Sequence, residues 1–216
     1  MTQPTTISIE RPPPKICKIE SACQFDRPRD RLSASALPCD GSFACSEEET
    51  NVDNRNPHRE FGLVSPEVAG RVSGVEFLQS LLDATYPAPP FSEVAEVWPI
   101  SVEVGRVAFE ASPSARFYNP MGLVHGGWLA LLLDTAMGCA VHSTLEPGQI
   151  YSTVEMKTAF VRPVRETTGK LRCEGVLLHA GSRIATSEGK VFDAGGRLVA
   201  HGSETCLIST IRSGTA

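Results

Sequence analysis

Hydrophobic and polar residues alternate in four long segments along the last third of the chain, at positions 152–164, 169–181, 183–194 and 197–210. Alternation with a period of two is typical of strands that bury one face. Turn signals such as Gly181-Ser182 separate the segments. Because parallel neighbours would need longer crossovers, this pattern predicts an antiparallel sheet. Two further short strands are predicted on either side of Val104-Gly105.

A continuous hydrophobic pattern predicts one long helix, from about Gly127 to Leu145. Small and apolar residues occupy nearly every side of this segment, and the Glu-Pro-Gly sequence at 146–148 ends it. A helix that is apolar on all sides must be surrounded by other structure. We therefore predict an α+β fold in which a curved antiparallel sheet wraps around one long central helix.

The first part of the chain divides in two. A Ser-Pro-Glu start signal at 65–67, followed by leucines at helical spacing, predicts a helix that ends at the proline-rich segment 86–91. Residues 1–62 show no persistent pattern and carry runs of proline and of glutamate, so we predict a disordered extension there. The folded domain is expected to span residues 63–212.

Asp134 is the single charged residue between His125 and His142 and is expected to be buried. An unpaired buried charge costs several kcal/mol, and such a residue is usually replaced unless something retains it. A purely structural carboxylate, satisfied by neighbouring hydroxyl or backbone groups, is the alternative. The position favours a functional role for Asp134.

Gly126 and Gly127 precede the long helix, where free N–H groups point outward. These donors could polarise a carbonyl that becomes an oxyanion, although the glycines could equally serve only to turn the chain. Asp134 lies eight residues beyond Gly126, which corresponds to roughly 12 Å along a helix. One carbonyl cannot contact both groups. If they serve one reaction, they come from two subunits, and we predict a homodimer with antiparallel helices and two shared sites.

The motif Asn-Pro-x-Gly-x-x-His-Gly-Gly at 119–127, with an acid nine residues after the histidine, resembles the hotdog-fold acyl-CoA thioesterases of the phenylacetate-pathway (PaaI-like) class. The resemblance continues to about Thr210 and leaves the N-terminal extension unexplained. It implies a homodimer that commonly pairs into a homotetramer. It also implies hydrolysis of a short-chain, medium-chain or aryl acyl-CoA to the free acid and coenzyme A. Coenzyme A is then part of the substrate, and no separate cofactor is expected.

The same resemblance implies a role for each motif residue. Asp134 attacks the thioester carbonyl or activates a water that does, and the Gly126 N–H polarises that carbonyl. Asn119 helps to hold the nucleophilic site, and Thr153 orients the water or the carboxylate. His125 shapes the loop by hydrogen bonding, with a direct catalytic role as the alternative.

Four positions are candidates for binding the rest of the substrate: Gly127, Arg162, Arg165 and Arg183. The arginines fall at predicted strand ends or turns, where the family tends to meet the phosphates of coenzyme A. Solvated sheet edges are the alternative interpretation for each arginine.

Composition excludes several other functions. The net charge is −5 and no basic stripe is present, so nucleic-acid binding is not expected. Seven cysteines without a CxxC pair or a Cys/His cluster predict no metal site and a cytoplasmic location. The longest apolar run, 128–133, is too short for a membrane span. Two alternatives to a thioesterase stay open: a non-catalytic hotdog module that binds acyl-CoA or lipid, and a hotdog dehydratase or hydratase.

Overall fold

The computed structural model describes residues 60–211, which contain six strands and four α-helices. The strands are β1 (Val97–Glu103), β2 (Arg106–Ala111), β3 (Gln149–Phe160), β4 (Leu171–Ala180), β5 (Ile184–Phe192) and β6 (Leu198–Thr210). The helices are α1 (Pro66–Ala69), α2 (Gly74–Leu82), α3 (Pro90–Ala95) and α4 (Gly126–His142). Within these residues, no helix is long and apolar enough to cross a membrane.

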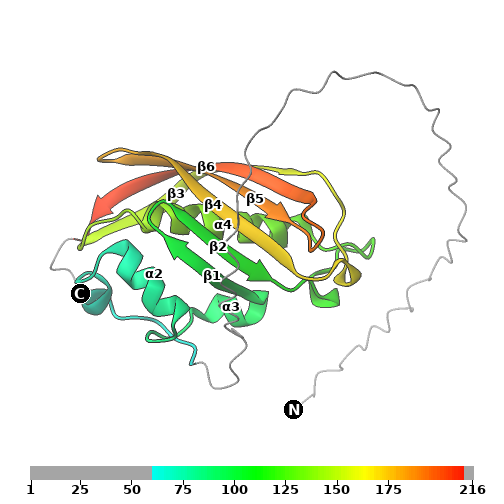
Figure 1. Ribbon diagram of the computed structural model, residues 1–216, viewed down its shortest axis with the longest axis horizontal. Coiled ribbons are helices and arrows are strands. Elements are labelled where there is room, and N and C mark those ends of the chain that lie inside the picture. Colours follow the sequence, from blue (N-terminus) through cyan, green and yellow to red (C-terminus); the bar gives the residue numbers. More distant parts are fainter. Residues whose placement is uncertain (1–59, 212–216) are drawn as a thin grey trace, which may run out of the picture. The chain divides into compact units, whose positions relative to one another are not determined.

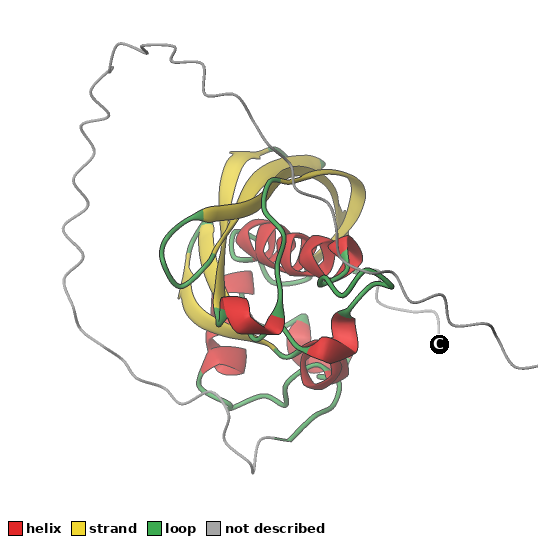
Figure 2. Ribbon diagram, turned by 90° about the vertical axis from the view of Figure 1, so that its right-hand side faces the viewer, coloured by secondary structure: helices red, strands yellow, loops and turns green. Residues whose placement is uncertain are grey.

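The six strands form one antiparallel sheet in the order β1-β2-β4-β5-β6-β3. The chain leaves the sheet after β2, forms α4, and returns at the far edge as β3. The sheet curves around α4, as the end-on view shows (Figure 1, Figure 2). The predicted α+β architecture, a curved sheet around one long helix, is confirmed.

The core lies between α4 and the concave face of the sheet. Leu132, Leu133 and Met137 on α4 are fully buried there. Two strand glycines allow the helix to approach closely. A Cβ atom on Gly175 would lie 2.0 Å from the Ala136 carbonyl oxygen, which is closer than any real contact. The absence of side chains at these strand positions therefore sets the depth at which α4 sits.

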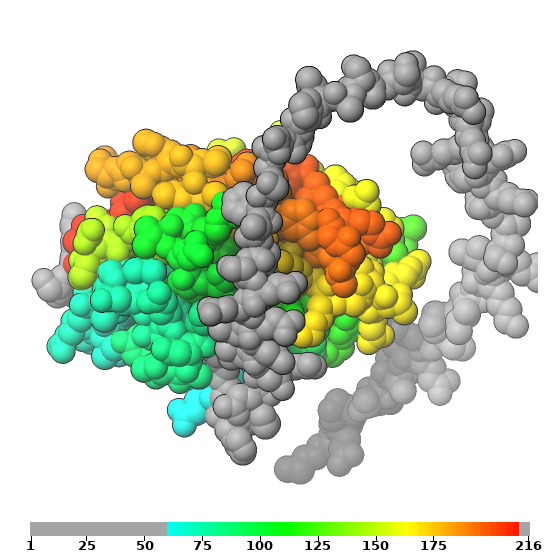
Figure 3. Space-filling model, in the orientation of Figure 1, coloured from blue at the N-terminus to red at the C-terminus, as the bar shows by residue number. Residues whose placement is uncertain are grey.

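The segment before the sheet differs from the prediction in two ways. The helix expected from Ser65 is divided, because Ser73 forms a capping box with Glu76 and starts a new helix, α2, there. The proline-rich segment that was expected only to end this helix also begins α3, since proline is tolerated in a first helical turn. Helices α2 and α3 contact β1, and Figure 3 shows this segment forming one continuous surface with β1 and β2.

The described residues begin at Glu60, three positions before the expected start of the folded domain. Phe61 forms an isolated bridge with Ala88, so residues 60–62 join the described structure. The predicted extension otherwise lies outside the described residues. The long helix ends at His142, three residues before its expected end at Leu145.

Candidate active site

The loop that leads into α4 is organised by the side chain of Asn119. Its Oδ1 accepts hydrogen bonds from the N–H groups of Met121 (2.9 Å) and Leu123 (3.2 Å). The Arg165 guanidinium donates to the Gly122 carbonyl at 2.7 Å. Gly122 has a φ of +72°, a left-handed conformation that favours glycine. These contacts hold the chain in position immediately before the helix.

His125 is the N-cap residue of α4. Its Nδ1 accepts a hydrogen bond of 2.9 Å from the Gly127 N–H, so the ring proton is on Nε2. The His125 carbonyl accepts from the Trp128 N–H. Within the described residues, the Gly126 N–H donates no hydrogen bond. Of the two glycines predicted to offer a donor, Gly126 therefore has its N–H free and Gly127 does not.

A cleft of about 260 Å³ opens beside this free N–H group. Phe160, at the end of β3, packs against Gly126, and a Cβ atom there would lie 3.0 Å from the ring. The cleft is lined by Asn119, Leu123, Val124, Gly126, Leu129, Phe160, Val161, Arg162, Pro163 and Val164. Two of the predicted site residues, Asn119 and Gly126, thus share one cleft with Arg162.

Asp134 lies in the middle of α4, on the side where β3 forms the edge of the sheet. Its Oδ1 is 3.1 Å from the Thr153 hydroxyl of β3. The prediction that Asp134 is buried is wrong for this single chain, in which the residue is only half-buried. The sheet covers most of α4 but ends at β3, and therefore leaves the Asp134 side partly open.

A second carboxyl group, which the sequence interpretation missed, lies on the other side of Thr153. Glu204 on β6 is 2% exposed, and its Oε1 is 2.8 Å from the Thr153 hydroxyl. The Cys206 thiol donates to the same oxygen at 2.9 Å. Burial raises the pKa of the Glu204 carboxyl, and the nearby Asp134 charge adds to this effect. A signal existed in the sequence, because Glu204 falls in the inward phase of its strand, two residues before buried Cys206.

Comparison with known proteins identifies the family. The Thioesterase superfamily profile matches residues 121–200. Over 109 residues, the chain is 34% identical to the proofreading thioesterase EntH of Klebsiella pneumoniae. The aligned residues make up 50% of this chain and 75% of EntH. The chain belongs to the thioesterase superfamily. The predicted family is thereby confirmed, and the protein is a thioester hydrolase.

Similar solved structures agree with this family assignment. A conserved protein of Pseudomonas aeruginosa is 32% identical, with a TM-score of 0.52 over 56% of this chain and 94% of that protein. A phenylacetic acid degradation-related protein of Ralstonia eutropha JMP134 is 28% identical, with a TM-score of 0.56 over 61% of this chain and 98% of that protein. The profile match includes Gly126, Asp134 and Thr153, and it stops before Glu204.

The arginines predicted to meet the substrate lie in two places in the thioesterase. Arg162 lines the Gly126 cleft and donates to the Leu198 carbonyl, and Arg165 is bound to the Gly122 loop. Arg183 lies exposed in the β4–β5 turn, at the opposite end of the sheet from the loop before α4 (Figure 1). Within one chain, the arginines therefore do not converge.

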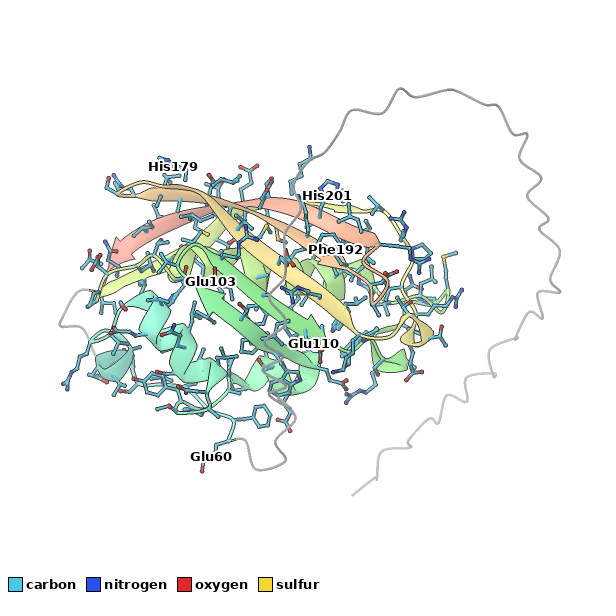
Figure 4. The ribbon with its side chains drawn as sticks, viewed as in Figure 1. Glu60, Glu103, Glu110, His179, Phe192 and His201 are labelled. Carbon is cyan, nitrogen blue, oxygen red and sulfur yellow. The ribbon has the colours of Figure 1, made fainter. Side chains whose placement is uncertain are left out.

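The other histidines among residues 60–211 are away from this site. His179 and His201 are exposed on the outer face of the sheet (Figure 4). His142, at the end of α4, packs against the rings of Phe77 and Tyr151, and burial lowers its pKa to about 4. In residues 60–211, no group of His, Cys, Asp and Glu side chains could hold a metal ion. The three described cysteines are free thiols.

The His125 cap leads to a testable prediction about stability. We expect His125→Ala to lower the free energy of unfolding by about 1 kcal/mol, because it removes the acceptor of the Gly127 N–H. His125→Asn keeps a side-chain acceptor at the N-cap and should lose less than half as much. Urea denaturation of both variants measures the difference. Equal losses would contradict the capping role, and a large loss of turnover in a stable His125→Asn variant would indicate a direct catalytic role.

Proposed function

We propose that the protein hydrolyses an acyl-CoA thioester to the free acid and coenzyme A, at two sites shared between the subunits of a homodimer. In each site, the Gly126 N–H of one subunit polarises the thioester carbonyl. Asp134 of the partner subunit attacks the carbonyl carbon or activates a water that does. Asn119, Thr153 and His125 support these two groups, and no cofactor takes part.

One observation carries this proposal: the free Gly126 N–H and the Asp134 carboxylate lie on the same helix, eight residues apart. At 1.5 Å per residue, the separation is about 12 Å along the axis, whereas both groups must come within about 3 Å of the reacting atoms. No single chain can bring them to one carbonyl. Two α4 helices that run antiparallel across a two-fold axis can do so twice.

The edge strand β3 supports such a dimer. It is the last strand of the sheet, and one of its sides pairs with no other strand of residues 60–211. Large hydrophobic side chains are exposed along it and just after it, including Val154 (57% exposed), Phe160 (49%) and Val161 (47%). A long edge strand with exposed hydrophobic side chains is prone to pair with another chain unless it is covered. Antiparallel pairing of two β3 strands would cover it and would bring the half-open sides of both α4 helices together.

The same pairing would bring Arg183 of one subunit close to Arg162 of the other. Arg183 lies near the start of β3, because its carbonyl accepts from the N–H of Ile208, whose register partner is Tyr151. Antiparallel pairing places the start of one β3 beside the end of the other, where the Arg162 cleft lies. Arg183 of the partner subunit would then face the cleft that holds Gly126. The arginine side chains would then lie close enough together to bind the phosphates of coenzyme A, although the chain as a whole is not basic.

The chemistry follows from these positions. The Gly126 N–H and the positive end of the α4 dipole stabilise the negative charge that develops on the carbonyl oxygen. Thr153 holds Oδ1 of Asp134, and the other carboxylate oxygen stays available for the carbonyl carbon or a water. If a water attacks, collapse of the tetrahedral intermediate breaks the C–S bond and leaves the free acid, and the coenzyme A thiolate takes up the proton that the water lost. If Asp134 attacks, the same collapse leaves a mixed anhydride on Asp134, which a water then hydrolyses to the free acid and the carboxylate. The small cleft, about 260 Å³, supports a short, medium or aryl acyl group.

A hybrid dimer tests the shared site. Asp134→Asn and Gly126→Pro subunits, each with its own affinity tag, are co-expressed, and the doubly tagged hybrid is purified. One of its sites combines an intact Gly126 with an intact Asp134, and the other site lacks both. We expect the hybrid to release coenzyme A from acyl-CoA at about half the wild-type rate per dimer, while each parent homodimer is about 100-fold or more slower than the wild type.

The controls separate assembly from chemistry. A doubly tagged wild-type dimer gives the full rate, and a blank without substrate corrects for any reaction of the thiol reagent with the protein's own cysteines. An inactive hybrid would overturn the shared site. An inactive wild type on short, medium and aryl acyl-CoAs alike would overturn the proposed substrate class.

A further inference from the structure

The Thr153 hydroxyl contacts two carboxyl groups but has only one hydrogen to donate. Its Oγ1 is 3.1 Å from Asp134 Oδ1 and 2.8 Å from Glu204 Oε1. If both carboxyl groups were ionised, the hydroxyl hydrogen could serve only one of these contacts. In the other contact, a lone pair of the hydroxyl oxygen would face a lone pair of the carboxylate oxygen. Both contacts are hydrogen bonds only if one carboxyl group is protonated and donates to Thr153. The arrangement therefore needs one neutral acid and one carboxylate.

Burial decides which of the two is neutral. Glu204 is 2% exposed, whereas Asp134 is half-buried at the open edge of the sheet. Burial penalises the charged form of an acid, so the negative charge belongs on the better-solvated Asp134. Glu204 Oε2 has no hydrogen-bond partner within residues 60–211, although an ionised carboxylate would need donors at both oxygens.

The groups that face Glu204 do not favour its charge. The Cys139 thiol of α4, the Tyr151 phenol of β3 and the Cys206 thiol of β6 are neutral, because burial raises the pKa of each. Ser187 of β5 is the register partner of Glu204, and its hydroxyl also has no partner. Among the described residues, Asp134 is the charged group that acts on Glu204, and it is of like sign. Among residues 60–211, no Lys, Arg or His forms an ion pair with Glu204.

We propose that Glu204 is a positioning residue for the thioesterase reaction. Its carboxyl group stays protonated during turnover and donates a hydrogen bond to Thr153. Thr153 in turn donates to Asp134. This directional chain, Glu204 to Thr153 to Asp134, fixes the orientation of the Asp134 carboxylate and keeps the charge on the reacting group. The inference rests on the proposed role of Asp134 in hydrolysis.

The pH dependence of turnover tests the chain. When Glu204 loses its proton at high pH, its carboxylate draws the Thr153 hydrogen away from Asp134, and kcat should fall. Glu204→Gln keeps a neutral donor of the same shape and cannot ionise. We expect its kcat to stay within about three-fold of wild type near neutral pH, and the alkaline fall to disappear. A wild-type alkaline fall that persists in Glu204→Gln would overturn the proposal.

A matched variant removes the donor altogether. Glu204→Leu has a similar volume and leaves Thr153 without its donor. We expect kcat to fall by about 10- to 100-fold with little change in KM, because the carboxylate loses its fixed orientation. Wild-type kcat in Glu204→Leu would overturn the positioning role.

Infrared spectroscopy gives a readout that does not depend on activity. At neutral pH, the wild-type protein should show the C=O stretch of a protonated carboxyl group, and Glu204→Gln should lack it. If no such band is lost, Glu204 is ionised and the proposal is overturned, even for an active thioesterase. If the band is present but the wild type hydrolyses no acyl-CoA, the proposed function fails while the placement of the proton stands.

Discussion

Asp134→Asn should lower kcat for acyl-CoA hydrolysis by about 10²- to 10⁴-fold, the range expected for loss of a nucleophile or general base. The amide has nearly the same shape as the carboxylate, and its oxygen can still accept from the Thr153 hydroxyl. Packing around α4 should therefore change little. KM should also change little, because Asp134 acts on the reacting carbon and not on the phosphates. Steady-state release of coenzyme A measures both constants.

Two controls make this result interpretable. Light scattering should show the same oligomer for Asp134→Asn and for the wild type, so that lost turnover is not lost assembly. Thr153→Val serves as the matched variant, because it removes the hydroxyl that contacts Asp134 and leaves the carboxylate in place. It should lose less activity than Asp134→Asn. Wild-type rates in Asp134→Asn would refute the proposed mechanism.

Gly126→Pro should lower kcat by about 10²- to 10³-fold, because it removes the free N–H group of a residue that lines the cleft. The local backbone accepts proline. Position 126 is the first residue of α4, where proline is well tolerated. The preceding His125 has φ −63° and ψ 135°, the extended conformation that a residue before proline adopts. The substitution therefore removes a donor without breaking the helix.

Gly126→Ala provides the matched control. Both variants place a Cβ atom about 3.0 Å from the Phe160 ring, and the proline variant also replaces the hydrogen on the nitrogen by Cδ of its ring. Only the proline variant lacks the N–H group. We expect Gly126→Ala to keep most of the activity, so that a loss confined to Gly126→Pro comes from the change at the backbone nitrogen and not from the added Cβ atom. Equal losses would assign the effect to crowding at Phe160 and would contradict the oxyanion role.

Much of the fold could be predicted because its signals are local. The period-two alternation that predicted strands at 169–181 and 197–210 depends only on neighbouring residues, as does the continuous apolar run that predicted α4. Ser73 and Pro90 show the limit of such signals. Each can begin a helix, but whether α2 and α3 form depends on β1, against which both helices pack.

For the site, the sequence alone determined that a lone acid and a free helix N-terminus lie on one helix, too far apart for one carbonyl. That result needs only the rise of an α-helix. The tertiary structure decided what surrounds the acid. Thr153 and Glu204 are 51 residues apart in the chain, and their contact exists because β3 and β6 pair in one particular register. Strand order likewise leaves β3 at the edge and Asp134 half-open. Register and strand order depend on long-range pairing, which local periodicity does not encode.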